Sequence, residues 1–332
     1  MDCARLNLTL AFVALAGVVS GALANTSLPL REAAWLSESG LAEALSSEPA
    51  FDRAALLDGA AQTSLALQYQ SPAALRRDLL AGEMVFRAPL LLGGQAAKAG
   101  LTCHSCHVNG RGNPAFQFPA ISGADGTADT THSFFSETLG NDIFDPATIP
   151  DLTQNGKIDH DPASRDLERF IATIVIGEFS GESVTEETLR PLTTFVRALR
   201  LVPPDDTSLR TPRTLASDLQ TARIALSEAE HRIAIGQTQL AQLLVSSAQE
   251  RLRSIHARLS SDVHEAEQEW LASQSAVLTG ARHILAQPGG EQSLASAKLE
   301  SARMAINKAE QFDWNEALSL YNPTVLADQL GQ

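Results

Sequence analysis

Cysteine and methionine are both scarce in this sequence. Its 332 residues include 3 cysteines and 3 methionines. A small secreted scaffold stapled by disulfides needs a much higher cysteine density, so that class is excluded and the fold must depend on a hydrophobic core. Apolar residues make up 44% of the chain, which is sufficient for such a core.

Basic residues are also few. Lysine and arginine total 25 against 39 aspartates and glutamates, which gives a net charge of −14. A nucleic-acid-binding protein needs a basic face to neutralise phosphates, so this composition predicts that nucleic acid is not a partner. An acidic surface instead favours association with basic or neutral protein partners.

Long apolar runs are missing except at the N-terminus. A run from Leu6 to Val19 follows Arg5, and Ala22-Leu23-Ala24 then supplies the small-x-small pattern of a signal-peptide cleavage site. The run is shorter than the roughly 20 residues that a bilayer-spanning helix needs. The sequence therefore predicts a signal peptide over residues 1–24, cleaved near Ala24, and a periplasmic protein. A retained membrane anchor is the alternative.

The two cysteines outside this leader lie in Cys103-His104-Ser105-Cys106-His107. Cys-x-x-Cys-His is the pattern to which haem c is attached. Cysteines one helical turn apart place both sulfurs where they can bond the two vinyl groups of one haem, and the adjacent histidine becomes the proximal iron ligand. We therefore expect one covalent haem c, held by Cys103 and Cys106 and ligated by His107.

Two other interpretations of the cysteine pair remain open. A thioredoxin-like redox pair would need a strand–helix unit around it, whereas the surrounding pattern is that of helices and loops. A zinc site would need a second pair of ligands, and the separation of His132 and His160 fits no common zinc pattern.

A helix is predicted before the motif, because Ser71-Pro72 is a typical helix start. A glycine on its buried face indicates a close crossing by another helix. Residues 103–160 contain too many glycines and prolines for long regular elements. Two further helices are expected, one from Asp161-Pro162 and one from a capping box at Ser183–Glu186. The buried stripes of the three helices are Leu75, Leu79, Gly82 and Phe86; Leu167, Phe170, Ile171 and Ile174; and Leu189, Leu192, Val196 and Leu199.

This arrangement resembles the cytochrome c superfamily over about residues 73 to 202. In that family a first helix with a glycine and an aromatic residue crosses a last helix with an apolar and aromatic face, and the haem motif lies between them. Gly82 and Phe86 are similar to the first partner, and Phe195, Val196 and Leu199 to the second. The segment Gly100 to Arg111 also resembles one domain of the di-haem cytochrome c peroxidase and methylamine-utilisation relatives.

The resemblance implies electron transfer through one haem to a redox partner protein in the cell envelope. A second Cys-x-x-Cys-His, which a di-haem peroxidase needs, does not occur in this sequence. The alternative is a haem enzyme with an open iron position, which would be a peroxidase-like oxidoreductase, or a haem-based sensor or scaffold. An electron carrier is the leading prediction and no catalytic residue is assigned.

The usual sixth iron ligand of the family is also missing. The methionines are Met1, Met84 and Met304, so none lies between His107 and Leu199, the stretch from which this family takes that ligand. Within this stretch His132 and His160 are the candidates that offer a nitrogen. We therefore predict that the distal ligand is not methionine.

One weaker pattern runs from Asp151 to Asp159. Its alternating oxygen-bearing residues before Gly156 are similar to the start of a calcium loop, but Pro162 stands where the closing glutamate is expected. An Asn-Gly turn explains the pattern equally well, so calcium is retained as a minor cofactor prediction.

Beyond Pro203-Pro204 apolar residues recur at spacings of three and four from Leu219 to Trp270, and Pro288-Gly289-Gly290 interrupts the pattern. This is typical of a coiled-coil-like helix, and a second helix over about 293–320 would complete an antiparallel hairpin through which the chain could self-associate. The expected fold is all-α. Its predicted parts are a signal peptide (1–24), an N-terminal helical extension (25–72), a cytochrome c-type haem domain (73–203), a linker (204–212) and a helical hairpin (213–332).

Overall fold

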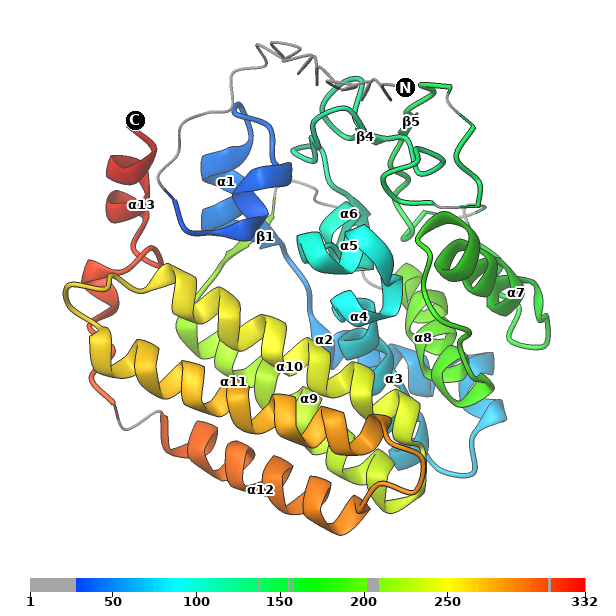
Figure 1. Cartoon of the computed structure of the whole chain (residues 1–332). Helices are drawn as coiled ribbons and strands as arrows, with labels where there is room; N and C mark the ends of the chain where they lie inside the picture. The colour runs from blue at the N-terminus through cyan, green and yellow to red at the C-terminus, as the bar shows by residue number, and fades with distance from the viewer. Residues whose placement is uncertain are drawn as a thin grey trace, which may run out of the picture.

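The structure is a computed structural model that describes residues 28–136, 138–141, 143–154, 156, 158–201, 209–309 and 312–331. The described residues are mostly helical, and each strand is only two or three residues long, so the all-α class is confirmed (Figure 1). The predicted signal peptide and residues 204–208 of the predicted linker lie outside the described residues. Within the described part, every helix is too short or too polar to cross a membrane.

The N-terminal extension consists of short helical and strand elements. They are η1 (Arg31–Trp35), α1 (Leu41–Ser46), β1 (Ser47–Pro49), α2 (Arg53–Ala61) and η2 (Ser64–Gln68). β1 pairs antiparallel with β6 (Arg210–Pro212), with Glu48 opposite Thr211. The last three residues of the predicted linker therefore form a strand that joins the extension to the chain beyond the motif.

The predicted helix before the motif is α3 (Pro72–Phe86). The Ser71 hydroxyl accepts a hydrogen bond from the Ala74 amide, and Pro72 occupies the first turn. α3 crosses α8 (Glu186–Ala198) so closely that a Cβ at Gly82 would lie 2.1 Å from the Pro191 carbonyl oxygen. The expected close crossing at this glycine is thus confirmed.

Short elements connect α3 to α8. They are α4 (Pro89–Leu92), α5 (Gly94–Ala99), α6 (Cys103–Cys106), β2 (His107–Val108), β3 (Arg111–Gly112), β4 (Thr127–Ala128), β5 (Ala147–Thr148), α7 (Asp166–Thr173), the π-helical turn η3 (Ile174–Glu178) and, after α8, η4 (Leu199–Leu201). β2 pairs with β3 and β4 with β5. Both helix starts were predicted too early. α7 begins after Arg165 because Asp161 accepts the Ala163 amide in a local turn, and α8 begins after Thr185.

The C-terminal part is a four-helix bundle. Its helices are α9 (Leu215–Ala234), α10 (Thr238–Arg258), α11 (Glu265–Ala286) and α12 (Gln292–Lys308), followed by η6 (Glu316–Leu318) and α13 (Pro323–Leu330). Each bundle helix packs against the next, and α12 packs back against α9 (Figure 1). The predicted two-helix hairpin is wrong in its number of helices. Gly236 ends α9 with a left-handed φ of +80°, and the apolar spacing continues because successive helices bury a face in the same core.

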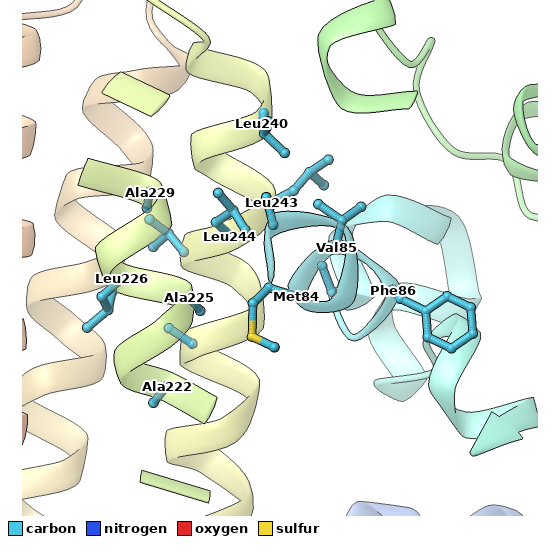
Figure 2. Packing of buried hydrophobic residues seen from close by; sticks show 14 of the residues in the cluster. Met84, Val85, Phe86, Ala222, Ala225, Leu226, Ala229, Leu240, Leu243 and Leu244 are labelled. Carbon is cyan, nitrogen blue, oxygen red and sulfur yellow. The ribbon is translucent and has the colours of Figure 1, made fainter. Parts of the chain in front are cut away.

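The bundle shares its core with α3. Met84 and Val85 lie against residues of α9 and α10 such as Ala225 and Leu244, and Phe86 points away from them (Figure 2). Residues of α2, α3, α8 and all four bundle helices belong to one continuous hydrophobic cluster. The region around the motif is therefore supported by the bundle along the length of α3.

A largely buried cluster of charged side chains also joins the extension to the bundle. Glu32 of η1 accepts a hydrogen bond from Arg213 Nη1 at 2.9 Å and another from Arg258 of α10. Burial alone would raise the pKa of Glu32, but the charges of Arg213, Arg258 and Arg251 outweigh it and lower that pKa from 4.5 to about 2. Because the folded-state pKa is the lower one, ionised Glu32 stabilises the fold above pH 4.5, and this contribution is lost as the pH falls toward 2.

We expect Glu32→Gln to flatten the dependence of the unfolding free energy on pH between about 4.5 and 2. Urea unfolding of both proteins at a series of pH values measures this. Glu43→Gln is the matched control, because Glu43 forms an exposed pair with Arg210 and such pairs contribute little. If the unfolding free energy fell equally steeply with decreasing pH in wild type and in Glu32→Gln, the assignment would be wrong.

Candidate cofactor site around Cys103 to His107

The motif is held in a defined turn of helix. Thr102 Oγ1 accepts the Ser105 amide at 3.2 Å, and Ser105 Oγ accepts the Thr102 amide at 3.1 Å, which forms a reciprocal capping box around α6. The cap fixes the turn between the two cysteines. Cys103 and Cys106 thereby lie on the same cavity together with His107.

This cavity has a volume of about 280 Å³ and its walls are mostly apolar. Its size is near the lower end of the ~300–1,000 Å³ typical of small-molecule sites. One wall is the apolar stripe of α7 and η3, whose member Phe170 is 58% exposed because it faces the cavity rather than a neighbouring helix. The lining aromatic side chains are Phe86, Phe116, Phe135, Phe170 and Phe179, and the aliphatic ones include Leu92, Leu101, Leu152, Leu167, Ile171, Ile174 and Val196.

His107 is oriented by a backbone carbonyl. Its Nδ1 lies 3.0 Å from the Pro150 oxygen, so Nδ1–H donates this bond and Nε2 keeps its lone pair. Burial lowers the pKa of His107 from 6.5 to about 4, although the Pro150 carbonyl raises it, so the ring is neutral at pH 7. A neutral imidazole with its second nitrogen hydrogen-bonded to a carbonyl is the usual state of a metal-ligating histidine.

The two cysteines are half-buried thiols. Burial raises the pKa of both Cys103 and Cys106 from 9.0 to about 12, and the two are not joined in a disulfide. A redox-active Cys-x-x-Cys pair needs a lowered pKa, so this environment disfavours the thioredoxin-like alternative. Zinc is also disfavoured, because the described chain contains no group of three His, Cys, Asp or Glu side chains able to hold a metal. The residues present fit haem c: two sulfurs and an oriented imidazole at the edge of an apolar cavity.

The two distal-ligand candidates lie away from this cavity. Neither His132 nor His160 is among the described residues that line it. His132 Nδ1 accepts the Phe134 amide at 3.0 Å, and His160 Nδ1–H donates to the Arg197 carbonyl at 3.2 Å. Both rings therefore serve local structure here, and this geometry gives the predicted distal role no support.

Sequence reasoning missed two residues of the site. Pro150 follows the motif by 43 positions, and only the fold brings its carbonyl to His107. Glu178, at the end of η3, places a carboxylate in the lining of the cavity. No sequence pattern marked this glutamate.

The carboxylates of the calcium-like stretch are engaged in turns. Asp151 Oδ1 accepts both the amide and the hydroxyl of Thr153, at 2.8 and 2.6 Å, and Asp159 Oδ1 accepts the Asp161 amide at 2.9 Å. Among the described residues of this stretch no acidic cluster forms. These bonds form local turns at Asp151 and Asp159, whereas Asn155 of the predicted Asn-Gly turn lies outside the described residues.

The described methionines also lie away from the cavity. Met84 is fully buried on the side of α3 that faces α9 and α10, whereas Phe86, which lines the cavity, points the other way (Figure 2). Met304 lies on α12 and is 50% exposed. These positions support the prediction that the iron has no methionine ligand.

We therefore expect Met84→Ala to lower the unfolding free energy by about 2–5 kcal/mol, because it opens a hole in the shared core. The absorption spectrum of the matured protein should stay unchanged. Chemical denaturation measures the change in stability, and near-infrared absorption of the folded protein measures the change in the spectrum. Met304→Ala is the exposed control. Loss of a sulfur-to-iron charge-transfer band in Met84→Ala would show instead that Met84 reaches the iron.

Comparisons with known proteins gave no relative: no protein-family model, no curated protein and no solved structure matches the chain.

Proposed function

We propose that the chain is a periplasmic mono-haem c-type cytochrome that carries electrons through one haem attached to Cys103 and Cys106. The observation that supports this most strongly is the placement of His107, a neutral imidazole bonded to the Pro150 carbonyl at the edge of a largely apolar cavity that both cysteines share. The crossing of α3 and α8 through Gly82 and Phe195 agrees with the cytochrome c resemblance.

The roles of the chain's own residues follow from this geometry. When bound, haem supplies an iron that changes between the ferric and ferrous states by one electron. Cys103 and Cys106 hold the group by thioether bonds, and Pro150 keeps the Nε2 lone pair of His107 available for the iron. The apolar walls exclude water, which lowers the local dielectric constant and favours the less charged redox state.

The partner is a redox protein of the cell envelope with a basic or neutral docking face, because this chain carries a net charge of −14. The C-terminal helices, predicted as a hairpin and found as a bundle, serve docking or self-association in this proposal. Their immediate structural role is to support α3.

A second function is favoured by the composition of the cavity wall. Apart from His107, its described lining residues offer no nitrogen or thioether ligand, and Glu178 contributes a carboxylate. An iron with an open sixth position would suit a peroxidase-like enzyme or a haem-based sensor of small ligands. In the enzyme, Glu178 is the group available for proton transfer.

The experiment uses protein matured with a cytochrome c assembly system. An electron carrier should give one reversible one-electron transition in a redox titration and react slowly with hydrogen peroxide. Rapid reaction with peroxide, slowed in Glu178→Gln, or a carbon monoxide complex of the reduced protein would favour the second function. Absence of any haem spectrum would refute both.

A further inference from the structure

A larger cavity of about 540 Å³ lies beside α6 and is separate from the site of the proposed haem. It is lined by His104 and Ser105 of the motif, whereas Cys103, Cys106 and His107 line the smaller cavity. Its other walls come from η1, α1 and β1 of the N-terminal extension, from the residues after β3, from β6 and from α10. The extension, the motif and the bundle thus meet around this space.

Cations outnumber anions in its lining, although the whole chain is strongly acidic. The lining contains six arginines and four glutamates, a formal excess of two positive charges before the histidines are counted. Arginine binds carboxylate and phosphate groups through paired N–H donors. The arginines are Arg31, Arg87, Arg210, Arg213, Arg251 and Arg253, and the glutamates are Glu32, Glu43, Glu48 and Glu250.

The glutamates of the cavity are shared among the arginines. Arg213 and Arg258 both pair with Glu32. Arg31, at 3.6 Å, and Arg253 both pair with Glu250. Arg210 pairs with Glu43 at 2.9 Å, and Arg251 pairs with Asp218, a carboxylate outside the lining, at 2.9 Å.

Arg87 is the least satisfied of these cations. Its side chain is only 9% exposed, and its Nη2 donates to Asn109 Oδ1 at 2.6 Å. Its Nε lies 3.7 Å from Glu83, a carboxylate that already accepts two hydrogen bonds from Arg53 at 2.7 and 2.6 Å.

Arg87 also lies beside His104, and burial lowers the pKa of Arg87 overall, although the nearby charge of Glu48 acts to raise it. Nη1 of Arg87 lies 3.0 Å from His104 Nε2. His104 Nδ1 accepts the Asn109 amide, so Nε2 carries the hydrogen and donates toward Glu48 at 3.3 Å. The Nη1 group of Arg87 therefore faces a donor, and its Nε is a buried donor with no hydrogen-bond partner among the described residues, so this arginine on the cavity wall retains an unmade charged hydrogen bond.

The same cavity also has an apolar wall. Leu30, Trp35 and Leu36 come from the extension, and Pro114 and Ala115 follow the motif. The two segments are joined by an antiparallel bridge between residues 36 and 116 and by a 2.7 Å hydrogen bond from the amide of residue 37 to the carbonyl of residue 115. The two apolar segments therefore lie side by side on one wall of the cavity, which an inorganic ion would leave unused.

We propose that this cavity binds a small organic anion, with its carboxylate or phosphate group on the arginines and its apolar body against the wall that contains Trp35. The volume falls within the ~300–1,000 Å³ of typical small-molecule sites. The buried arginine with an unmade hydrogen bond supplies the affinity for the anionic group, and the apolar wall selects for an organic body.

Isothermal titration calorimetry of the full-length matured protein tests this, with benzoate, phenyl phosphate and inorganic phosphate as probes at low ionic strength. Binding of benzoate or phenyl phosphate at least tenfold tighter than that of inorganic phosphate supports the proposal, and the tighter of the two identifies the anionic group. Equal affinity for inorganic and phenyl phosphate, or no heat from any probe up to about 10 mM, overturns it.

Two variants locate the binding. Ala44 of α1 lines the cavity, so Ala44→Phe should fill it and abolish binding, whereas Ala42→Phe on the same helix, outside the lining, should bind like wild type. Arg253→Ala removes a cation at the rim, with a side chain 48% exposed, and should weaken binding about tenfold without unfolding the protein. Wild-type affinity in Ala44→Phe overturns the assignment to this cavity.

Discussion

Replacing His107 by glycine should abolish the wild-type absorption spectrum of the reduced protein while the haem stays attached to the chain. The two thioether bonds do not depend on His107, but the iron loses the nitrogen that the Pro150 carbonyl orients. Added imidazole should restore much of the spectrum, because it can enter the space left by the missing ring.

His104→Gln is the matched control for this prediction. His104 lies in the same motif but lines the larger cavity, where its Nε2 faces Glu48. This variant should keep the wild-type spectrum. If His107→Gly also kept it, or if His104→Gln lost it instead, the assignment of the proximal ligand would be wrong.

The second large effect is expected at Gly82. Gly82→Ala should lower the unfolding free energy by about 3 kcal/mol or more, at the upper end of the overpacking range, because its Cβ would lie 2.1 Å from the Pro191 carbonyl oxygen and 2.7 Å from Phe195 Cβ. A backbone oxygen cannot move aside as a flexible side chain can, so α3 and α8 would have to separate.

Gly59→Ala on α2 provides the control. Among the described residues a Cβ there would meet only Leu201, at 3.7 Å, so this change should stabilise the protein by about 0.5–1 kcal/mol through helix propensity. Thermal or urea unfolding of the two variants beside wild type measures the difference. Equal stability of Gly82→Ala and wild type would show that the two helices do not cross as closely as described.

Sequence patterns predicted the features that depend on local chemistry. Ser71-Pro72 placed the start of α3, and the glycine on its apolar face indicated the crossing that the structure shows at Gly82. The Cys-x-x-Cys-His spacing identified the residues that share the smaller cavity. Each of these signals lies within a few positions along the chain.

Features set by distant residues were not predictable in the same way. The Pro150 carbonyl reaches His107 across a long irregular segment. His132 and His160 were predicted because each can offer a nitrogen, but His132 Nδ1 accepts a hydrogen bond in a local turn and His160 Nδ1–H donates one to a backbone carbonyl. The apolar spacing predicts two helices and not four because it persists through the turn at Gly236. Periodicity reports which side of a helix is buried and not where the chain reverses.

The most direct test of the account is the intact mass of the mature protein under denaturing conditions, after expression with a cytochrome c assembly system. The account predicts a chain heavier by one haem, with Cys103 and Cys106 unreactive toward a thiol-alkylating reagent. A Cys103→Ser and Cys106→Ser double variant should lose the added mass. A wild-type chain without haem, in which both cysteines are alkylated, would contradict the central claim.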